Sequence, residues 1–239
     1  SPPNQLDNMS MFNSFSRNPV KHGVIVLLVV LLSACEIKTR TDIFLGDLFD
    51  VINTGDVIDT ESKLSVQIAS KDECNSNSAK LLPMLQGAFG ESVHAEGCLE
   101  EGMNTFAVFG MKIPILIEDA MAHRSDTLAL ALFQEEEWYG LRMTINVGRM
   151  KNLSKLISDE FFQTVDFSTA DVAITIANDL REKVSIAIRG AFVDGKPVQE
   201  YTDFTLKRRD ELDVQLSDVA GASAFTNGVA GLFYFRLSD

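Results

Sequence analysis

Short stretches of alternating apolar and polar residues are the most frequent local pattern in this sequence. In residues 36–43, for example, Ile37, Thr39, Thr41 and Ile43 alternate with charged residues. Because successive side chains of a β-strand point to opposite faces of a sheet, this period of two predicts strands with one buried face. Alternating or continuously apolar runs predict further strands at 63–69, 105–109, 112–117, 127–133, 138–146, 171–177, 183–192, 212–216 and 230–237.

Helical patterns are fewer and shorter. Residues 75–78 are typical of a turn, and Pro83 limits the helix that follows them. The Asp194-Gly195 pair favours a tight hairpin, and Pro114 indicates an edge or a bulge because proline cannot donate a ladder hydrogen bond. The whole pattern predicts an α+β fold, a mainly antiparallel β-sheet with a few short helices, in one exported domain. The helices are expected at 47–52, 79–88, 147–162 and 217–225.

The composition fits a folded, acidic protein. Of the 239 residues, 46% are hydrophobic and 23% are charged, which excludes a disordered chain. The net charge is −13, so no nucleic-acid partner is expected, because nucleic-acid binding relies on clustered Lys and Arg. The basic triplet Lys207-Arg208-Arg209 is followed at once by acidic residues, which favours a solvated turn.

A short apolar run at residues 24–32 follows the basic residues Arg17 and Lys21. A transmembrane helix needs roughly 20 apolar residues, so this run is too short to span a bilayer. A basic segment followed by a short apolar run is typical of an export signal. The alternative is a short buried helix, but it explains neither the basic flank nor the abrupt change to charged residues at 36–40.

The run ends in Leu32-Ser33-Ala34-Cys35, which resembles the lipobox of bacterial lipoproteins. The resemblance covers residues 17–36. It implies that Cys35 is linked to diacylglycerol through a thioether, that the chain is cut before Cys35, and that the new amino group is acylated, with palmitate expected among the acyl chains. Ordinary signal cleavage after Ala34 is the alternative, although it leaves the bulky Leu32 where a small residue is preferred.

The resemblance also implies a location. In lipoproteins of enteric-type bacteria, Asp after the cysteine favours inner-membrane retention, so Glu36 favours the periplasmic face of the outer membrane. Residues 1–34 then comprise upstream residues and a signal peptide, with Met9 or Met11 as the start. Residues 35–239 form a single lipid-anchored periplasmic domain. Removing the leader, which holds two basic residues and one acidic residue, changes the net charge from −13 to −14.

The first predicted strand begins directly after Cys35, without a Ser/Gly-rich spacer. The folded domain is therefore expected to sit against the bilayer. Lys38 and Arg40 on this strand would then be membrane-proximal and face lipid headgroups, where each basic residue contributes up to about 1 kcal/mol. A solvated strand face is an equally acceptable interpretation.

If Cys35 carries lipid, Cys74 and Cys98 remain. Exported proteins reside in an oxidising compartment, where such a pair is expected to form a disulfide. The alternative is a reactive or metal-binding thiol pair, but the spacing is not C-x-x-C and only His94 lies nearby in the sequence.

The sequence carries none of the common enzyme motifs. It lacks the G-x-S-x-G, H-E-x-x-H, P-loop and G-x-G-x-x-G patterns, and neither His94 nor His123 has a local orienting motif. No catalytic residue, metal or cofactor is therefore assigned. The acidic triplet at 135–137 favours a charged hairpin turn. A second set of acidic and amide residues recurs every three positions: Asp47, Asp50, Asn53, Asp56 and Asp59. The ligands of an EF-hand calcium loop recur every two positions, so this spacing favours a capped helix and a polar turn over calcium binding.

These patterns favour a lipid-anchored, non-enzymatic binding or accessory protein of the cell envelope. Acylation would concentrate it at the membrane, where an envelope protein is the expected partner. Two alternatives stay open: a periplasmic hydrolase acting on envelope polymers, and a phage- or plasmid-encoded exclusion lipoprotein. A pocket joining a histidine, a carboxylate and a serine would favour the hydrolase. The Phe233-Tyr234-Phe235 run suits either a partner interface or a core strand.

Overall fold

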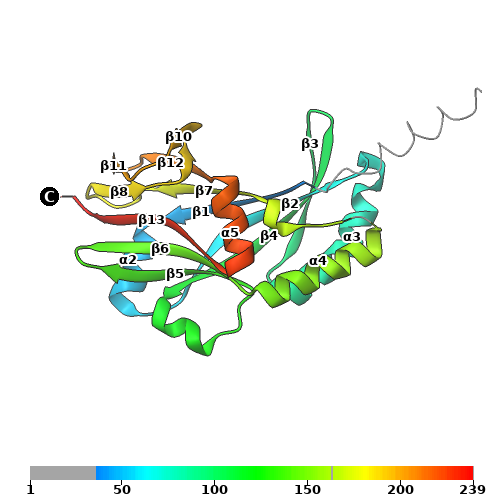
Figure 1. The fold of residues 1–239 in the computed structure, drawn as a ribbon, viewed down its shortest axis with the longest axis horizontal. Coiled ribbons are helices and arrows are strands. Elements are labelled where there is room, and N and C mark those ends of the chain that lie inside the picture. The colour runs from blue at the N-terminus through cyan, green and yellow to red at the C-terminus, as the bar shows by residue number, and fades with distance from the viewer. Residues whose placement is uncertain (1–35, 163, 239) are drawn as a thin grey trace, which may run out of the picture. The chain divides into compact units, whose positions relative to one another are not determined.

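One large β-sheet dominates the fold (Figure 1). The computed structural model describes residues 36–162 and 164–238, and within them thirteen strands form a single sheet. The strands are β1 (Ile37–Phe44), β2 (Ile58–Ile68), β3 (His94–Glu101), β4 (Asn104–Ile117), β5 (Leu128–Glu135), β6 (Trp138–Ile145), β7 (Asp171–Ala177), β8 (Val184–Ile188), β9 (Ala191–Val193), β10 (Lys196–Val198), β11 (Thr202–Leu206), β12 (Glu211–Leu216) and β13 (Val229–Leu237).

The strand order is β10-β9-β12-β7-β1-β2-β4-β5-β6-β13-β8-β11, and β3 pairs with β4 beside this path. β8 and β9 stand near opposite ends of the order, yet only Arg189 and Gly190 separate them in the chain. Gly190 has a φ of +64°, which side-chain-bearing residues rarely adopt, and there the chain changes its partner from β13 to β12. The sheet therefore nearly closes on itself. Its described pairs are antiparallel, apart from β1–β7 and β4–β5.

The inward face of this curved sheet supplies the hydrophobic core. The alternation predicted for the first strand is present, because Ile37, Thr41 and Ile43 are buried while Arg40 and Asp42 are exposed. The buried apolar side chains of the long strands other than β3 join in one continuous cluster. Their burial supplies the main favourable term in folding. The opposite face of β1 is left free to carry charge.

The helices of the described residues connect strands. α3 packs against β3, β4 and α4, and α5 joins β12 to β13. α5 begins after Ser217, whose hydroxyl accepts a hydrogen bond from the backbone N–H of Ala220 and so caps the helix. The α-helices are α2 (Leu45–Thr54), α3 (Lys71–Phe89), α4 (Val147–Phe161) and α5 (Asp218–Asn227), with 3₁₀ turns η1 (Glu118–His123) and η2 (Phe167–Thr169).

The predicted α+β class is wrong, because the described chain is mainly β. β3 shows no apolar alternation in the sequence, since nearly all its side chains are exposed, and in β11 three of the five residues are exposed. The separate strands predicted at 105–109 and 112–117 are one continuous strand, β4, and β2 begins five residues before its predicted start at Lys63. Strands that are exposed on both faces leave no pattern that sequence periodicity can detect.

α3 also differs from its prediction. It begins at Lys71, so residues 75–78 are helical, and Pro83 lies inside the helix. Asn and Ser disfavour helices only weakly, and tertiary packing of one helix face overrides that preference. The buried face has helical spacing and consists of Cys74, Ser78, Leu81 and Leu85.

Several local predictions are confirmed. β9 and β10 pair through the turn at Asp194-Gly195, and residues 136–137 connect the hairpin of β5 and β6. Pro114 lies in the part of β4 that pairs only with β2, between the parts paired with β3 and β5. Lys207-Arg208-Arg209 is exposed at a turn. Phe233-Tyr234-Phe235 belongs to a core strand, because both phenylalanines are buried.

Candidate functional site

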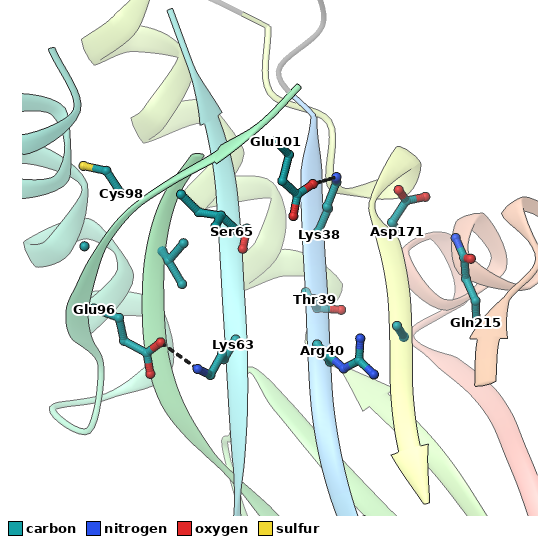
Figure 2. Close-up of a pocket in the computed structure, with 14 residues that line it drawn as sticks. Lys38, Thr39, Arg40, Lys63, Ser65, Glu96, Cys98, Glu101, Asp171 and Gln215 are labelled. Carbon is teal, nitrogen blue, oxygen red and sulfur yellow. Dashed lines mark hydrogen bonds and ion pairs between the residues drawn. The ribbon is translucent and has the colours of Figure 1, made fainter. Parts of the chain in front are cut away.

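The outward face of the sheet carries a groove of about 510 Å³ (Figure 2). Its floor comes from β1, β2, β4 and β7, and β3 forms one side. Gln215 of β12 lies at the other side. Figure 2 shows β3 crossing obliquely over its neighbours toward the start of β1. The groove therefore lies where the described chain begins.

Strand register gathers charged side chains in this groove. Lys38 of β1 lies opposite Ser65 of β2 and Asp171 of β7, while Arg40 lies opposite Lys63 of β2. Because side chains of a strand alternate between the two faces, Lys38 and Arg40 share the outward face. Lys63 and Ser65 share it for the same reason. Three cations from two neighbouring strands thus meet on one surface.

Each of these three cations is held by at least one carboxylate. The partners come from strands on both sides of β1 and β2, and from Glu36 just before β1. The ion pairs and their N–O distances are Lys38–Glu101 (2.7 Å), Lys38–Glu36 (3.2 Å), Arg40–Asp213 (2.6 Å) and Lys63–Glu96 (3.0 Å).

Arg40 and Lys63 are like charges on directly opposed positions, an arrangement that destabilises a sheet. The side chain of Lys63 reaches Glu96 on β3 (Figure 2). The side chain of Arg40 reaches Asp213 on β12. Both cationic side chains are more than half exposed. Exposed ion pairs contribute less than about 1 kcal/mol each, so a charged ligand can exchange places with these partners at small cost.

Asp171 differs from the other carboxylates of the groove. In the described part of the chain it makes no ion pair within 4.0 Å. Partial burial, and then repulsion from Glu36, raise the pKa of Asp171 above its ordinary value. By contrast, hydrogen bonding to Glu101 raises the pKa of Lys38, which keeps that ammonium charged. The groove is therefore suited to a ligand that brings a positive group, alone or together with a negative one.

The side of the groove formed by β3 is held in place by a covalent link. The predicted disulfide is confirmed: Cys98 of β3 is bonded to Cys74 of α3, with Cα atoms 6.2 Å apart. Glu100 of β3 also pairs with Lys71 of α3 at 2.9 Å. β3 pairs with β4 alone. The links to α3 therefore give β3 a second attachment to the rest of the domain.

The structure places the residues singled out from the sequence as follows. Lys38 and Arg40, predicted to be membrane-proximal, both lie in the groove and are both ion-paired. Cys35 and the side chain of His123 lie outside the described residues. His94 is exposed on β3, with its ring 3.1 Å from a backbone carbonyl and 4.0 Å from a glutamate oxygen. The described side chains thus give His94 no serine partner of the kind that the hydrolase hypothesis requires.

Sequence reasoning missed four charged residues that line the groove, and Asp213, which pairs with Arg40 beside it. Lys63 and Asp171 begin predicted strands, so their outward direction was available from the alternation alone. Glu96 and Glu101 lie on β3, which has no apolar pattern. Asp213 is 173 positions from its partner Arg40, and the strand order β12-β7-β1 brings the two together.

None of the described helices is long and apolar enough to cross a membrane. Within the part of the chain that the structure describes, His, Cys, Asp and Glu side chains do not gather in groups of three or more that could hold a metal ion. The three-residue spacing between 47 and 59 corresponds to α2, the turn after it and the start of β2.

Comparison with known proteins adds a family. No curated protein and no solved structure matches the chain. A family model described as a domain of unknown function (DUF7424) matches residues 38–239, which include every residue that lines the groove and all the strands apart from the first residue of β1. Because the match extends over most of the sequence, the chain belongs to the DUF7424 family.

Proposed function

We propose that this protein is a lipid-anchored, non-enzymatic binding protein on the periplasmic face of the bacterial outer membrane. Acylation of Cys35 provides the anchor, and the charged groove takes a component of the envelope. The lipobox-like segment supports the anchor, and Glu36 after the cysteine supports the outer membrane. The exchangeable ion pairs support binding as the task of the groove.

One observation carries this proposal: the acylation site and the groove are continuous in the chain. Glu36, the residue directly after Cys35, pairs with Lys38 inside the groove. Consecutive Cα atoms are about 3.8 Å apart, so an anchor at Cys35 holds the groove close to the bilayer. Confinement at a surface raises the effective concentration of the groove for a partner in the same membrane.

Acylation is tested by Cys35→Ala in an enteric host that expresses the chain with its own leader. The original protein is expected to incorporate labelled palmitate and to sediment with membranes, whereas the variant does neither, because the thioether cannot form. Glu36→Gln serves as the control and should keep the label. Glu36→Asp is expected to move the protein to the inner-membrane fraction on a density gradient. The anchor is refuted by a Cys35→Ala variant that stays in membranes while the original chain takes up no palmitate.

Binding by the groove is tested by charge reversal. With a photocrosslinker at Ser65, the original protein is expected to yield a crosslinked envelope component. Lys63→Glu is expected to abolish that product because it reverses the charge that a negative group of the ligand would meet when it displaces Glu96. Lys112→Glu is the matched control. Lys112 is also exposed on a strand and lies 4.0 Å from a glutamate, Glu61, but it does not line the groove. Equal crosslinking by both variants would show that the groove does not bind.

A further inference from the structure

Two large apolar side chains of the described chain are almost completely exposed. Met103 is 102% exposed and Phe162 is 94% exposed, and the next in order, Val219, is 80% exposed. Met103 lies in the two-residue turn between β3 and β4, and Phe162 follows the last residue of α4. Single exposed apolar residues are common on protein surfaces, so the location of these two in the fold decides whether they have a role.

Met103 lies beside the point where the described chain begins. Asn104, the next residue, has its side-chain nitrogen 3.4 Å from a carboxylate oxygen of Glu36. Glu101, two residues before Met103, pairs with Lys38. Figure 1 shows the β3–β4 hairpin projecting beyond the neighbouring strands. The turn that carries Met103 thus contacts Glu36, the residue that follows Cys35, through the side chain of Asn104.

Phe162 lies at the same end of the domain. Its neighbours Phe161 and Val165 line a cavity together with Gln67 at the end of β2. The backbone N–H of Gln67 donates to the carbonyl oxygen of Glu36 at 2.8 Å. Two separate turns, one from a hairpin and one from a helix end, therefore flank the entry of the chain.

The two glutamates beside the hairpin tip are each held in an ion pair with a lysine. Glu100 and Glu101 precede the turn, and acidic groups there would be repelled by an anionic membrane surface. Glu100 is paired with Lys71 at 2.9 Å and Glu101 with Lys38 at 2.7 Å. Both glutamates beside Met103 are therefore held in ion pairs with lysines. The disulfide to Cys98 holds the hairpin against α3, so the tip keeps a fixed direction.

We propose that Met103 and Phe162 enter the interface of the bilayer and orient the anchored domain, so that the groove opens along the membrane. This inference rests on the proposed acylation of Cys35, because one or two side chains bind a bilayer too weakly without a tether that raises their local concentration. The lipid bilayer is favoured over a protein partner because both tips flank the chain entry that the acyl chains would bring to its surface.

The test uses the acylated protein in liposomes of phosphatidylethanolamine and phosphatidylglycerol. Met103→Cys is labelled with a polarity-sensitive fluorophore, and the Cys74–Cys98 disulfide leaves the new thiol available. Its emission is expected to shift to shorter wavelength on reconstitution and to be quenched by nitroxide-bearing lipids. Phe162→Cys is expected to behave in the same way.

Val57→Cys provides the matched control. Val57 is also exposed, at 41%, but it lies just before the first residue of β2, at the end of the strand opposite Gln67. Because strands rise about 3.3 Å per residue, Val57 is roughly 33 Å from Gln67. Its emission is expected not to shift. Flotation and palmitate incorporation are measured on the same samples, so acylation is scored separately from the position of the tips.

If the protein floats with the liposomes but the Met103 and Phe162 labels behave like the Val57 label, the bilayer contact is refuted and the anchor stands. If labelling at Met103 is protected only in native envelope membranes and not in liposomes, a protein covers the tip and the proposal is again wrong. If palmitate is absent and no variant floats, the proposed anchor itself has failed.

Discussion

Removing the Cys74–Cys98 disulfide is expected to lower the free energy of unfolding by about 3–4 kcal/mol. The cysteines are 24 positions apart, and in the chain-entropy model a cross-link that closes a loop of this length removes roughly that much freedom from the unfolded chain. Cys74 is fully buried, so its loss also disturbs packing. The comparison uses Cys74→Ala/Cys98→Ala in a Cys35→Ala background, with urea unfolding followed by circular dichroism.

The control separates the cross-link from the side chains. Ser78→Ala changes a neighbouring polar group on the same buried face of α3 and keeps the disulfide, so it is expected to cost far less. Dithiothreitol added to the parent protein should reproduce most of the loss seen in the double variant. A decrease below about 1 kcal/mol would mean that β3 is held mainly by its pairing with β4 and by its ion pairs.

The strands that can be predicted from the sequence are those with one buried face and one solvent-exposed face. β1, β6, β7 and β12 each bury alternate residues, and periodicity finds them within about a residue. Periodicity does not detect β3, because one of its faces borders the groove and the other faces solvent, so neither face is apolar. Its sequence therefore resembles that of a charged loop. The error in fold class follows from this, since the hidden strands shift the balance from α+β to mainly β.

The groove is harder to predict than the strands for a different reason. Alternation indicates that Lys38 and Arg40 point outward, but it does not reveal which strand lies next to β1. Its neighbour β7 is parallel and more than 120 residues away, and β7 brings Asp171 beside Lys38. β7 also holds β12 two strands from β1, where Asp213 pairs with Arg40.

Cysteine counting, in contrast, succeeded because it does not depend on topology. Two cysteines left over in an exported chain are expected to pair wherever the fold puts them. Their position on β3 and α3 gives this prediction its consequence for the site, because β3 forms one side of the groove. The same covalent link therefore supports both stability and the shape of the binding surface.

Asn178→Ala is expected to destabilise the protein by about 3 kcal/mol, because it leaves several buried polar groups without hydrogen-bond partners at once. Asn178 is completely buried just after β7. Its side-chain nitrogen donates to the carbonyls of Glu182 and Leu206, both at 2.9 Å, and its oxygen accepts from the N–H of Leu180 at 3.0 Å. Alanine removes all three bonds and leaves their backbone partners without replacements.

The backbone of Asn178 adds a second link, because its N–H donates to Asp210 and its carbonyl accepts from Arg209. The residue therefore ties the loop after β7 to the turn before β12. Those two strands carry Asp171, which lines the groove, and Asp213, which pairs with Arg40. Asn178→Asp tests the donors alone: the carboxylate can still accept from Leu180 but cannot donate to the two carbonyls, so a similar loss is expected. Asn227→Ala, at an exposed amide on α5, is expected to change the unfolding free energy by less than about 0.5 kcal/mol. Equal effects of Asn178→Ala and Asn227→Ala in urea unfolding would show that water enters and replaces the lost partners.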